Sequence, residues 1–131
     1  MLRTTSAARN FAMFGVPVLL GILELGHPAF SPWDSVIDTL APIAPWWTAL
    51  HVVQVPLFGL LGLAVVLLLG DLKSRAAQVS RCAIAVFVVV YPAFDGAVGI
   101  ASGVMLQNLG TIGTIERAAV EPALWALFWV R

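Results

Sequence analysis

The chain has 131 residues, of which 60% are hydrophobic and 11% charged, and its formal net charge at pH 7 is zero. Soluble domains usually carry about 25% charged residues, so this composition excludes an ordinary soluble domain. With a mean hydropathy of +0.96, the chain is predicted to be an integral membrane protein whose first partner is the lipid bilayer. It has no basic patch and no nucleic-acid-binding motif, so we expect no nucleic-acid partner.

The first predicted membrane span covers residues 11–30. The basic start of the chain resembles a signal peptide, but Pro17 and Glu24 interrupt the apolar run and no A-x-A cleavage site follows. We therefore expect a transmembrane helix, with an irregularity near Pro17 because proline lacks an amide hydrogen. Near the end of this span, Glu24 and His27 are three residues apart and would share one helical face.

Residues 31–45 carry two aspartates but no Lys or Arg. We expect Asp34 or Ser35 to cap a short helix that reaches Leu40 and lies on the membrane surface. Tryptophan is enriched where a membrane meets water, and three residues fit such a belt: Trp33, Trp46 and Trp47.

The second predicted span, residues 46–70, is the clearest one because it contains no charged residue. His51 and Gln54 lie about one turn apart near its start. Gly59 and Gly62 follow on the same face, where they would let a neighbouring helix approach closely.

The third predicted span, residues 82–106, has one charged residue, Asp95, near its middle. A carboxylate at this depth costs at least about 2.5 kcal/mol on insertion scales, so Asp95 should face other helices and have a partner. Three glycines follow it at spacings that predict tight helix packing: Gly96, Gly99 and Gly103. The single cysteine, Cys82, excludes an internal disulfide and a cysteine zinc cluster.

The C-terminal part is predicted to hold a polar connection over residues 107–117 and a short helix over residues 118–130. The apolar run after Pro122 has about nine residues, which at about 1.5 Å per residue is too short to cross a bilayer. Two interpretations stay open: an interfacial helix, or a fourth span that is truncated.

The basic residues predict how these spans are oriented. Positive residues favour the cytoplasmic side, and five of the seven fall on one side of the predicted topology: Arg3, Arg9, Lys73, Arg75 and Arg81. We therefore expect a multi-pass protein of the cell (plasma or inner) membrane with a cytoplasmic N-terminus.

In this orientation the polar residues of all three spans lie at similar depth. Counted at about 1.5 Å per residue from each cytoplasmic end, they lie about 20 to 28 Å into the membrane. We interpret them as one polar layer in the outer half of the bilayer, with Tyr91 just below it: Glu24, His27, His51, Gln54 and Asp95.

Three uses of this polar layer are open. The leading one is helix packing in a structural or assembly component. The second is proton or solute translocation, because imidazole ordinarily titrates near neutral pH. The third is a redox role, with a metal held by His27, His51, Glu24 and Asp95 or a haem between His27 and His51. The sequence by itself requires no cofactor.

Familiar catalytic motifs are missing from the sequence. There is no H-E-x-x-H, no G-x-S-x-G, no phosphate-binding glycine loop and no CxxCH. We therefore favour a protein without catalytic activity. Because three helices enclose little volume, translocation would call for a homo-oligomer or for other membrane subunits.

Three stretches resemble a group of uncharacterised bacterial multi-span membrane proteins: LHVVQVPLFGLLGLAVVLLL (50–69), SRCAIAVFVVVYPAFDGAVGIASGV (80–104) and ERAA (116–119). The likeness covers the second and third predicted spans, less than half of the chain. It implies an integral membrane protein of bacterial type that continues beyond this chain, and it implies no activity. The predicted fold class is an all-α transmembrane helical bundle, a single domain over residues 1–131 with three spans and a short fourth helix.

Overall fold

The computed structural model describes residues 6–29, 31, 34–109 and 113–128. Within these residues the fold is all-helical, without a strand, as the sequence predicts. Three helical stretches in the described part are long and apolar enough to cross a membrane: Ala7–Glu24, Val36–Leu68 and Arg75–Asn108. A shorter C-terminal helix follows them, so the predicted fold class is confirmed.

The chain divides into two compact units. The first unit comprises Met1–Gly26 and Val53–Ala93, and the second comprises His27–Val52 and Phe94–Arg131. Two long helices, α4 (Ala44–Leu68) and α5 (Arg75–Asp95), contribute residues to both units.

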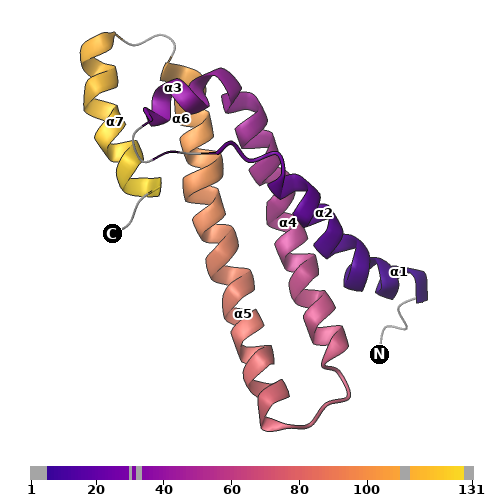
Figure 1. Ribbon diagram of the computed structural model, residues 1–131. Coiled ribbons are helices and arrows are strands. Elements are labelled where there is room, and N and C mark those ends of the chain that lie inside the picture. The colour runs from indigo at the N-terminus through magenta and orange to yellow at the C-terminus, as the bar shows by residue number, and fades with distance from the viewer. Residues whose placement is uncertain (1–5, 30, 32–33, 110–112, 129–131) are drawn as a thin grey trace. The chain divides into compact units, whose positions relative to one another are not determined.

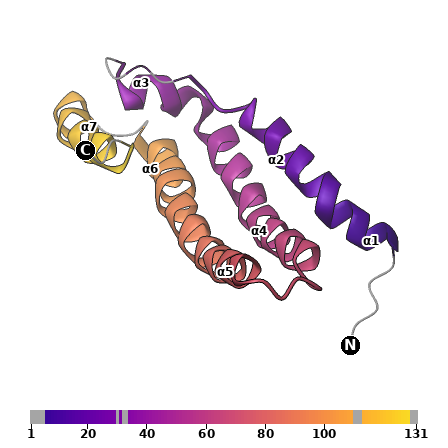
Figure 2. The same cartoon turned by 60° about the horizontal axis from the view of Figure 1, so that its bottom comes forward.

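In the first unit, α4 lies between an N-terminal helical stretch and α5 (Figures 1 and 2). The N-terminal stretch consists of α1 (Ser6–Asn10), η1 (Phe11–Gly15) and α2 (Val16–Glu24). Apolar side chains from the three helices form the core: Val16, Leu20 and Phe58, with Leu57, Leu61 and Phe87 packed around them. The irregularity expected near Pro17 is a π-helical turn, η1, that ends two residues before this proline.

The first helix ends at Glu24, six residues before the predicted boundary at residue 30. The amides of Leu25 and Gly26 bond to carbonyls three residues back, which closes the last turn. Pro28 then disfavours a helical conformation at His27. The prediction that Glu24 and His27 share a helical face is therefore wrong, because His27 lies outside the helix.

The third helical stretch begins at Arg75, seven residues before the predicted start at residue 82. Ser74 explains the earlier start, because its hydroxyl accepts a hydrogen bond from the amide of Ala77 at 3.2 Å. Such a cap satisfies a donor that the first helical turn leaves unpaired. Polar residues that the sequence places in a loop thus form the first turns of α5.

The second unit is built from the start of α4 and from shorter helices on either side of it in the sequence. These are α3 (Val36–Leu40), η2 (Ala41–Ile43), η3 (Gly96–Ala101), α6 (Ser102–Asn108) and α7 (Thr114–Phe128). Their core consists of Val36, Ile37, Leu40, Ala44, Trp47, Leu106, Leu109 and Leu124.

Helix α3 confirms the predicted short helix reaching Leu40. Ser35 rather than Asp34 is its cap, since the Ser35 hydroxyl accepts from the amide of Asp38 at 3.1 Å. The apolar face of α3 is buried in the core of the second unit instead of being spread on a surface, with Val36 and Leu40 fully buried. The apolar residues of α3 therefore pack against other helices of the second unit, and the position of α3 relative to a membrane stays a prediction.

Of the two belt tryptophans that the structure describes, one is exposed and one is buried. Trp46 is exposed, whereas Trp47 is buried in the core of the second unit. Trp33 lies outside the described residues.

Helix α7 begins at Thr114, four residues earlier than the predicted start at residue 118. The predicted polar connection over residues 107–117 therefore shrinks, since α6 runs to Asn108. With 15 residues, α7 is about 22 Å long, too short to cross a bilayer. It is held to the second unit by Leu124, which is fully buried in the core.

Candidate functional site

Two imidazoles and a carboxylate meet in the second unit. His51 lies on α4, Asp95 is the last residue of α5, and His27 lies in the loop after α2. The Nε2 atoms of His27 and His51 are 3.4 Å apart, and His51 Nε2 is 3.7 Å from Asp95 Oδ1. His51 and Asp95 are only 4% and 6% exposed. We refer to these three residues as the histidine–aspartate cluster.

Helix α4 fixes which nitrogen of His51 carries a hydrogen. His51 Nδ1 is 2.7 Å from the carbonyl oxygen of Trp47, one turn earlier. A carbonyl oxygen only accepts hydrogen bonds, so Nδ1 must be the donor. In neutral His51, Nε2 then presents a lone pair, and His27 must be the donor across the 3.4 Å contact.

The Trp47 ring packs against both imidazoles. Its ring centroid lies 4.3 Å from that of His51 and 5.4 Å from that of His27. The two imidazoles meet edge to face, with centroids 5.1 Å apart. Aromatic contacts of this kind orient rings and add to packing.

Gly99 provides the space in which the His51 ring sits. A Cβ atom at Gly99 would overlap the His51 side chain, and one at Gly103 would overlap Thr48. Gly99 and Gly103 are spaced four residues apart, as in close helix crossings in membranes. Two of the predicted packing glycines therefore face α4 within the second unit.

Polar contacts strengthen the same helix crossing. The Trp47 Nε1 group donates to the Ser102 hydroxyl at 3.3 Å, and Ser102 in turn donates to the carbonyl of Val98. The Gln107 amide donates to the Thr48 hydroxyl at 2.8 Å. Sequence reasoning missed Gln107, although it lies one helical turn after Gly103.

The other members of the predicted polar layer belong to the first unit. Gln54 is 1% exposed, and its Nε2 donates to Glu24 Oε1 at 2.9 Å. Tyr91 lies in an aromatic group, with its ring 4.5 Å from Phe58 and 5.0 Å from Phe87. The structure thus brings together His27, His51 and Asp95 in one unit and Glu24 with Gln54 in the other.

The remaining predicted packing glycines differ from one another. Gly62 faces α5, because a Cβ atom there would overlap Val88. A Cβ atom at Gly59 or at Gly96 would meet no other atom within 4 Å. Within the described residues, no close contact supports the packing role predicted for these two glycines.

The redox interpretation gains no support from the geometry. Among the described residues, no group of three or more His, Cys, Asp or Glu side chains is arranged to hold a metal ion. Axial haem ligands must stand on opposite faces of a porphyrin. The imidazoles of His27 and His51 touch each other directly, which leaves no room for a macrocycle between them.

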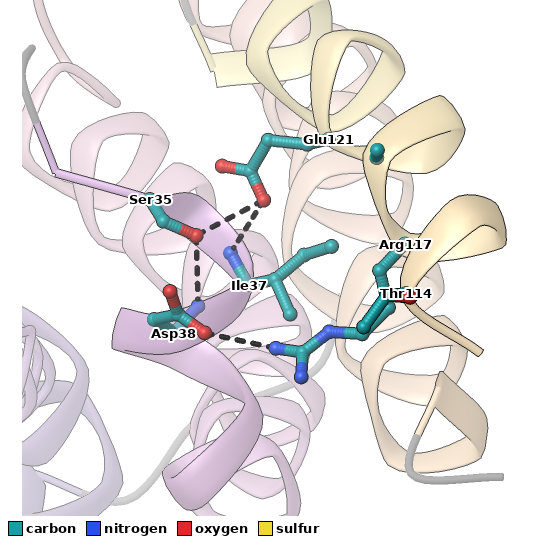
Figure 3. A pocket seen from close by; sticks show the side chains of 7 residues that line it. Ser35, Ile37, Asp38, Thr114, Arg117 and Glu121 are labelled. Carbon is teal, nitrogen blue, oxygen red and sulfur yellow. Dashed lines mark hydrogen bonds and ion pairs between the residues drawn. The ribbon is translucent and has the colours of Figure 1, made fainter. Parts of the chain in front are cut away.

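A second polar site joins α7 to the start of α3 (Figure 3). The Glu121 carboxylate accepts from the Ser35 hydroxyl at 3.1 Å and from the amides of Val36 and Ile37 at 2.6 and 3.2 Å. Arg117 pairs with Asp38 at 2.8 Å. An open hollow of about 320 Å³ lies here, lined by Ser35, Ile37, Asp38, Thr114, Arg117, Ala118 and Glu121.

Sequence reasoning missed this second site. A signal was present, because Arg117 and Glu121 are one helical turn apart, and Ser35 and Asp38 have a similar spacing. The carboxylate of Glu121 meets free amides at the start of α3, where negative charge is favourable. The arrangement anchors α7 to the start of α3.

The described residues therefore define an all-helical protein with three helical stretches that are long and apolar enough to cross a membrane. Polar side chains join helices within each unit. Comparisons with protein-family models, with curated proteins and with solved structures found no match.

Proposed function

We propose that the protein is a structural or assembly component of a bacterial cell membrane, with three spans and a cytoplasmic N-terminus. Exposed apolar side chains along the long helices support the membrane location, among them Phe14, Val18, Val86, Val89 and Leu68. Such a large apolar surface is stable against lipid and costly in water. The resemblance to bacterial multi-span proteins supports the same assignment.

The orientation rests on the connections between the helices. The α4–α5 connection and the start of α5 carry Lys73, Arg75 and Arg81, whereas α3 carries Asp38 and no basic residue. This asymmetry follows the positive-inside rule for a cytoplasmic α4–α5 connection.

One observation carries the structural role: buried polar groups are used to join different helices. Asp95 of α5 faces His51 of α4, and Ser102 of α6 bonds to Trp47 of α4. In a membrane, apolar surface gives no preference for helix over lipid, so close packing and interhelical hydrogen bonds must hold a bundle together.

Asp95 variants test this proposal. Asp95→Asn keeps a polar side chain of the same shape, so we expect its unfolding free energy in detergent to stay close to that of the wild type. Asp95→Ala removes the buried carboxylate that faces His51 Nε2 at 3.7 Å and should lose about 1 kcal/mol, typical of an interhelical polar contact in a membrane. Equal stability of all three proteins would contradict the structural role.

A second candidate function, proton translocation, is favoured by a specific contact. His51 Nε2 lies near both His27 Nε2 and Asp95 Oδ1, so a proton bound there would have an imidazole on one side and a carboxylate on the other. Such groups within a membrane commonly mark proton relays.

The same Asp95→Asn variant separates the two functions. In vesicles loaded with a pH-sensitive dye, a proton carrier should dissipate an imposed pH gradient, and Asp95→Asn should abolish that flux. If the pH gradient decays equally slowly in vesicles with wild type, with the variant and with no protein, the carrier function is wrong and the structural role stands.

A further inference from the structure

A groove of about 250 Å³ lies between α4 and α5 in the first unit. Its α4 wall runs from Gly59 to Val66 and its α5 wall from Arg81 to Val88. On each helix the lining residues recur at spacings of three and four, so one face of each helix forms a wall. Gly59 leaves the groove open, because no atom lies within 4 Å of the position of its missing Cβ.

The only charge among the lining residues is Arg81. Its Nη2 group donates to the carbonyls of Leu69, Gly70 and Leu72, where α4 ends. These contacts fix the guanidinium at the end of the groove that adjoins the α4–α5 connection. Its Nε and Nη1 groups form no hydrogen bond within the described residues, so their N–H donors can meet an anion.

The charged residues near Arg81 give this region a net positive charge. Asp71, Lys73 and Arg75 are exposed in or beside the same connection. With Arg81 they comprise three positive charges and one negative charge, a net charge of +2. The apolar groove therefore ends in a basic region that lies at the cytoplasmic surface in the proposed orientation.

We propose that this groove binds one anionic phospholipid, with an acyl chain along the apolar walls and the phosphate on Arg81. The proposal rests on the membrane location given above. From Gly59 to Val66 the groove extends about 10 Å along α4, about a third of the hydrocarbon core. A guanidinium suits phosphate because it offers several donors in one plane.

The positive charges at the end of the groove also favour one kind of occupant over others. A zwitterionic headgroup would bring its own cation towards Lys73 and Arg75, whereas an anionic headgroup would not. A second copy of the chain, docked by twofold symmetry, would bring another Arg81 against the first, and like charges oppose association. An anionic lipid therefore fits this groove better than either alternative.

The test compares spin-labelled phosphatidylglycerol with spin-labelled phosphatidylcholine in phosphatidylcholine vesicles that contain the protein. Electron spin resonance gives the fraction of each lipid held at the protein. We expect phosphatidylglycerol to be preferred about fivefold, the effect of about one basic residue at a membrane surface. Arg81→Gln should reduce the preference to near one. Arg75→Gln makes the same charge change outside the groove and should lower the preference less than Arg81→Gln does, because Arg75 does not line the groove.

Glycine variants test the groove without changing charge. Gly59→Leu should fill the groove and lower the preference for phosphatidylglycerol. Gly21→Leu is the matched control, since Gly21 also has open space around it but does not line the groove. Because neither position is crowded, both variants should fold even if Arg81→Gln does not.

The outcomes separate this inference from the proposed membrane location. If the protein floats with vesicles but shows no preference for phosphatidylglycerol, the lipid site is wrong and the membrane location stands. An equal loss of preference in Arg75→Gln and Arg81→Gln points to diffuse attraction and also overturns it. If Gly59→Leu changes self-association and leaves lipid preference intact, the groove is a contact between copies. Failure to float with vesicles overturns both proposals.

Discussion

At the scale of single residues, His51 is held by groups of three kinds. A backbone carbonyl fixes its Nδ1 hydrogen, the Trp47 ring lies against its face, and Gly99 leaves the space for its ring. These three contacts orient the His51 ring independently of the groups that face its Nε2 atom. Gly99 therefore helps to position His51, because a Cβ atom there would overlap its side chain.

Two glycines in the same π-helical segment provide a matched prediction. Gly99→Ala places a methyl group where the His51 ring lies, and overpacking of this kind typically costs about 1–3 kcal/mol. Gly96→Ala enters open space, so it should be neutral or slightly stabilising, because alanine favours helix more than glycine does.

Denaturation of the two variants in mild detergent, followed by circular dichroism, measures the difference. A comparable loss of stability in both would mean that the π-helical backbone itself needs glycine. The space made for His51 would then not be the cause.

At the scale of elements, α7 is secured by one carboxylate and one apolar side chain. Glu121 takes three hydrogen bonds from the start of α3, and Leu124 enters the core one turn later. The Arg117–Asp38 pair lies beside them, but the Asp38 side chain is 76% exposed. Exposed pairs of this kind are worth about 0–1 kcal/mol.

We therefore predict that the two neighbouring polar contacts of α7, the Glu121 hydrogen bonds and the Arg117–Asp38 ion pair, differ in strength. Glu121→Ala leaves the amides of Val36 and Ile37 without their acceptor, and an unmade buried hydrogen bond costs about 1–3 kcal/mol. Arg117→Ala should cost less than about 1 kcal/mol.

Limited proteolysis at the α6–α7 connection, together with the unfolding free energy, measures both effects. Faster cleavage in Glu121→Ala than in Arg117→Ala is expected. The reverse order would show that the exposed ion pair, rather than the cap on α3, anchors α7.

At the scale of the whole molecule, the proposed topology places the α4–α5 connection inside and the start of α7 outside. The chain has a single cysteine, so a Cys82→Ser background allows one new cysteine at a time. In intact cells, Ser74→Cys should be protected from a membrane-impermeant maleimide, whereas Thr114→Cys should be labelled. Permeabilised cells should show labelling of both.

The labelling pattern also tests each part of the topology. Reversed labelling would mean a cytoplasmic α7 and an external N-terminus. Labelling of both positions from one side would show that the stretch Arg75–Asn108 does not cross the membrane.

The sequence by itself determined the all-helical class and the three long apolar stretches. Both follow from local properties: runs of apolar residues, few charges and prolines that end or distort helices. It also indicated Gly99, Gly103 and Asp95, because small residues and a charge are conspicuous in an apolar span. Helix ends were less accurate, since Leu25, Gly26 and Ser74 act through hydrogen bonds that composition does not reveal.

Only the tertiary structure decided which polar residues are partners. Depth along a helix is one coordinate, so it predicted a common layer but not the rotation of each side chain about its helix axis. That rotation pairs His51 with Asp95 in one unit and Gln54 with Glu24 in the other. His27 reaches His51 from the loop after α2, where no helical periodicity places it. Helix rotation also pairs Glu121 with α3, a contact between residues 84 to 86 positions apart. Contacts at such separations depend on how the helices pack, which no local pattern encodes.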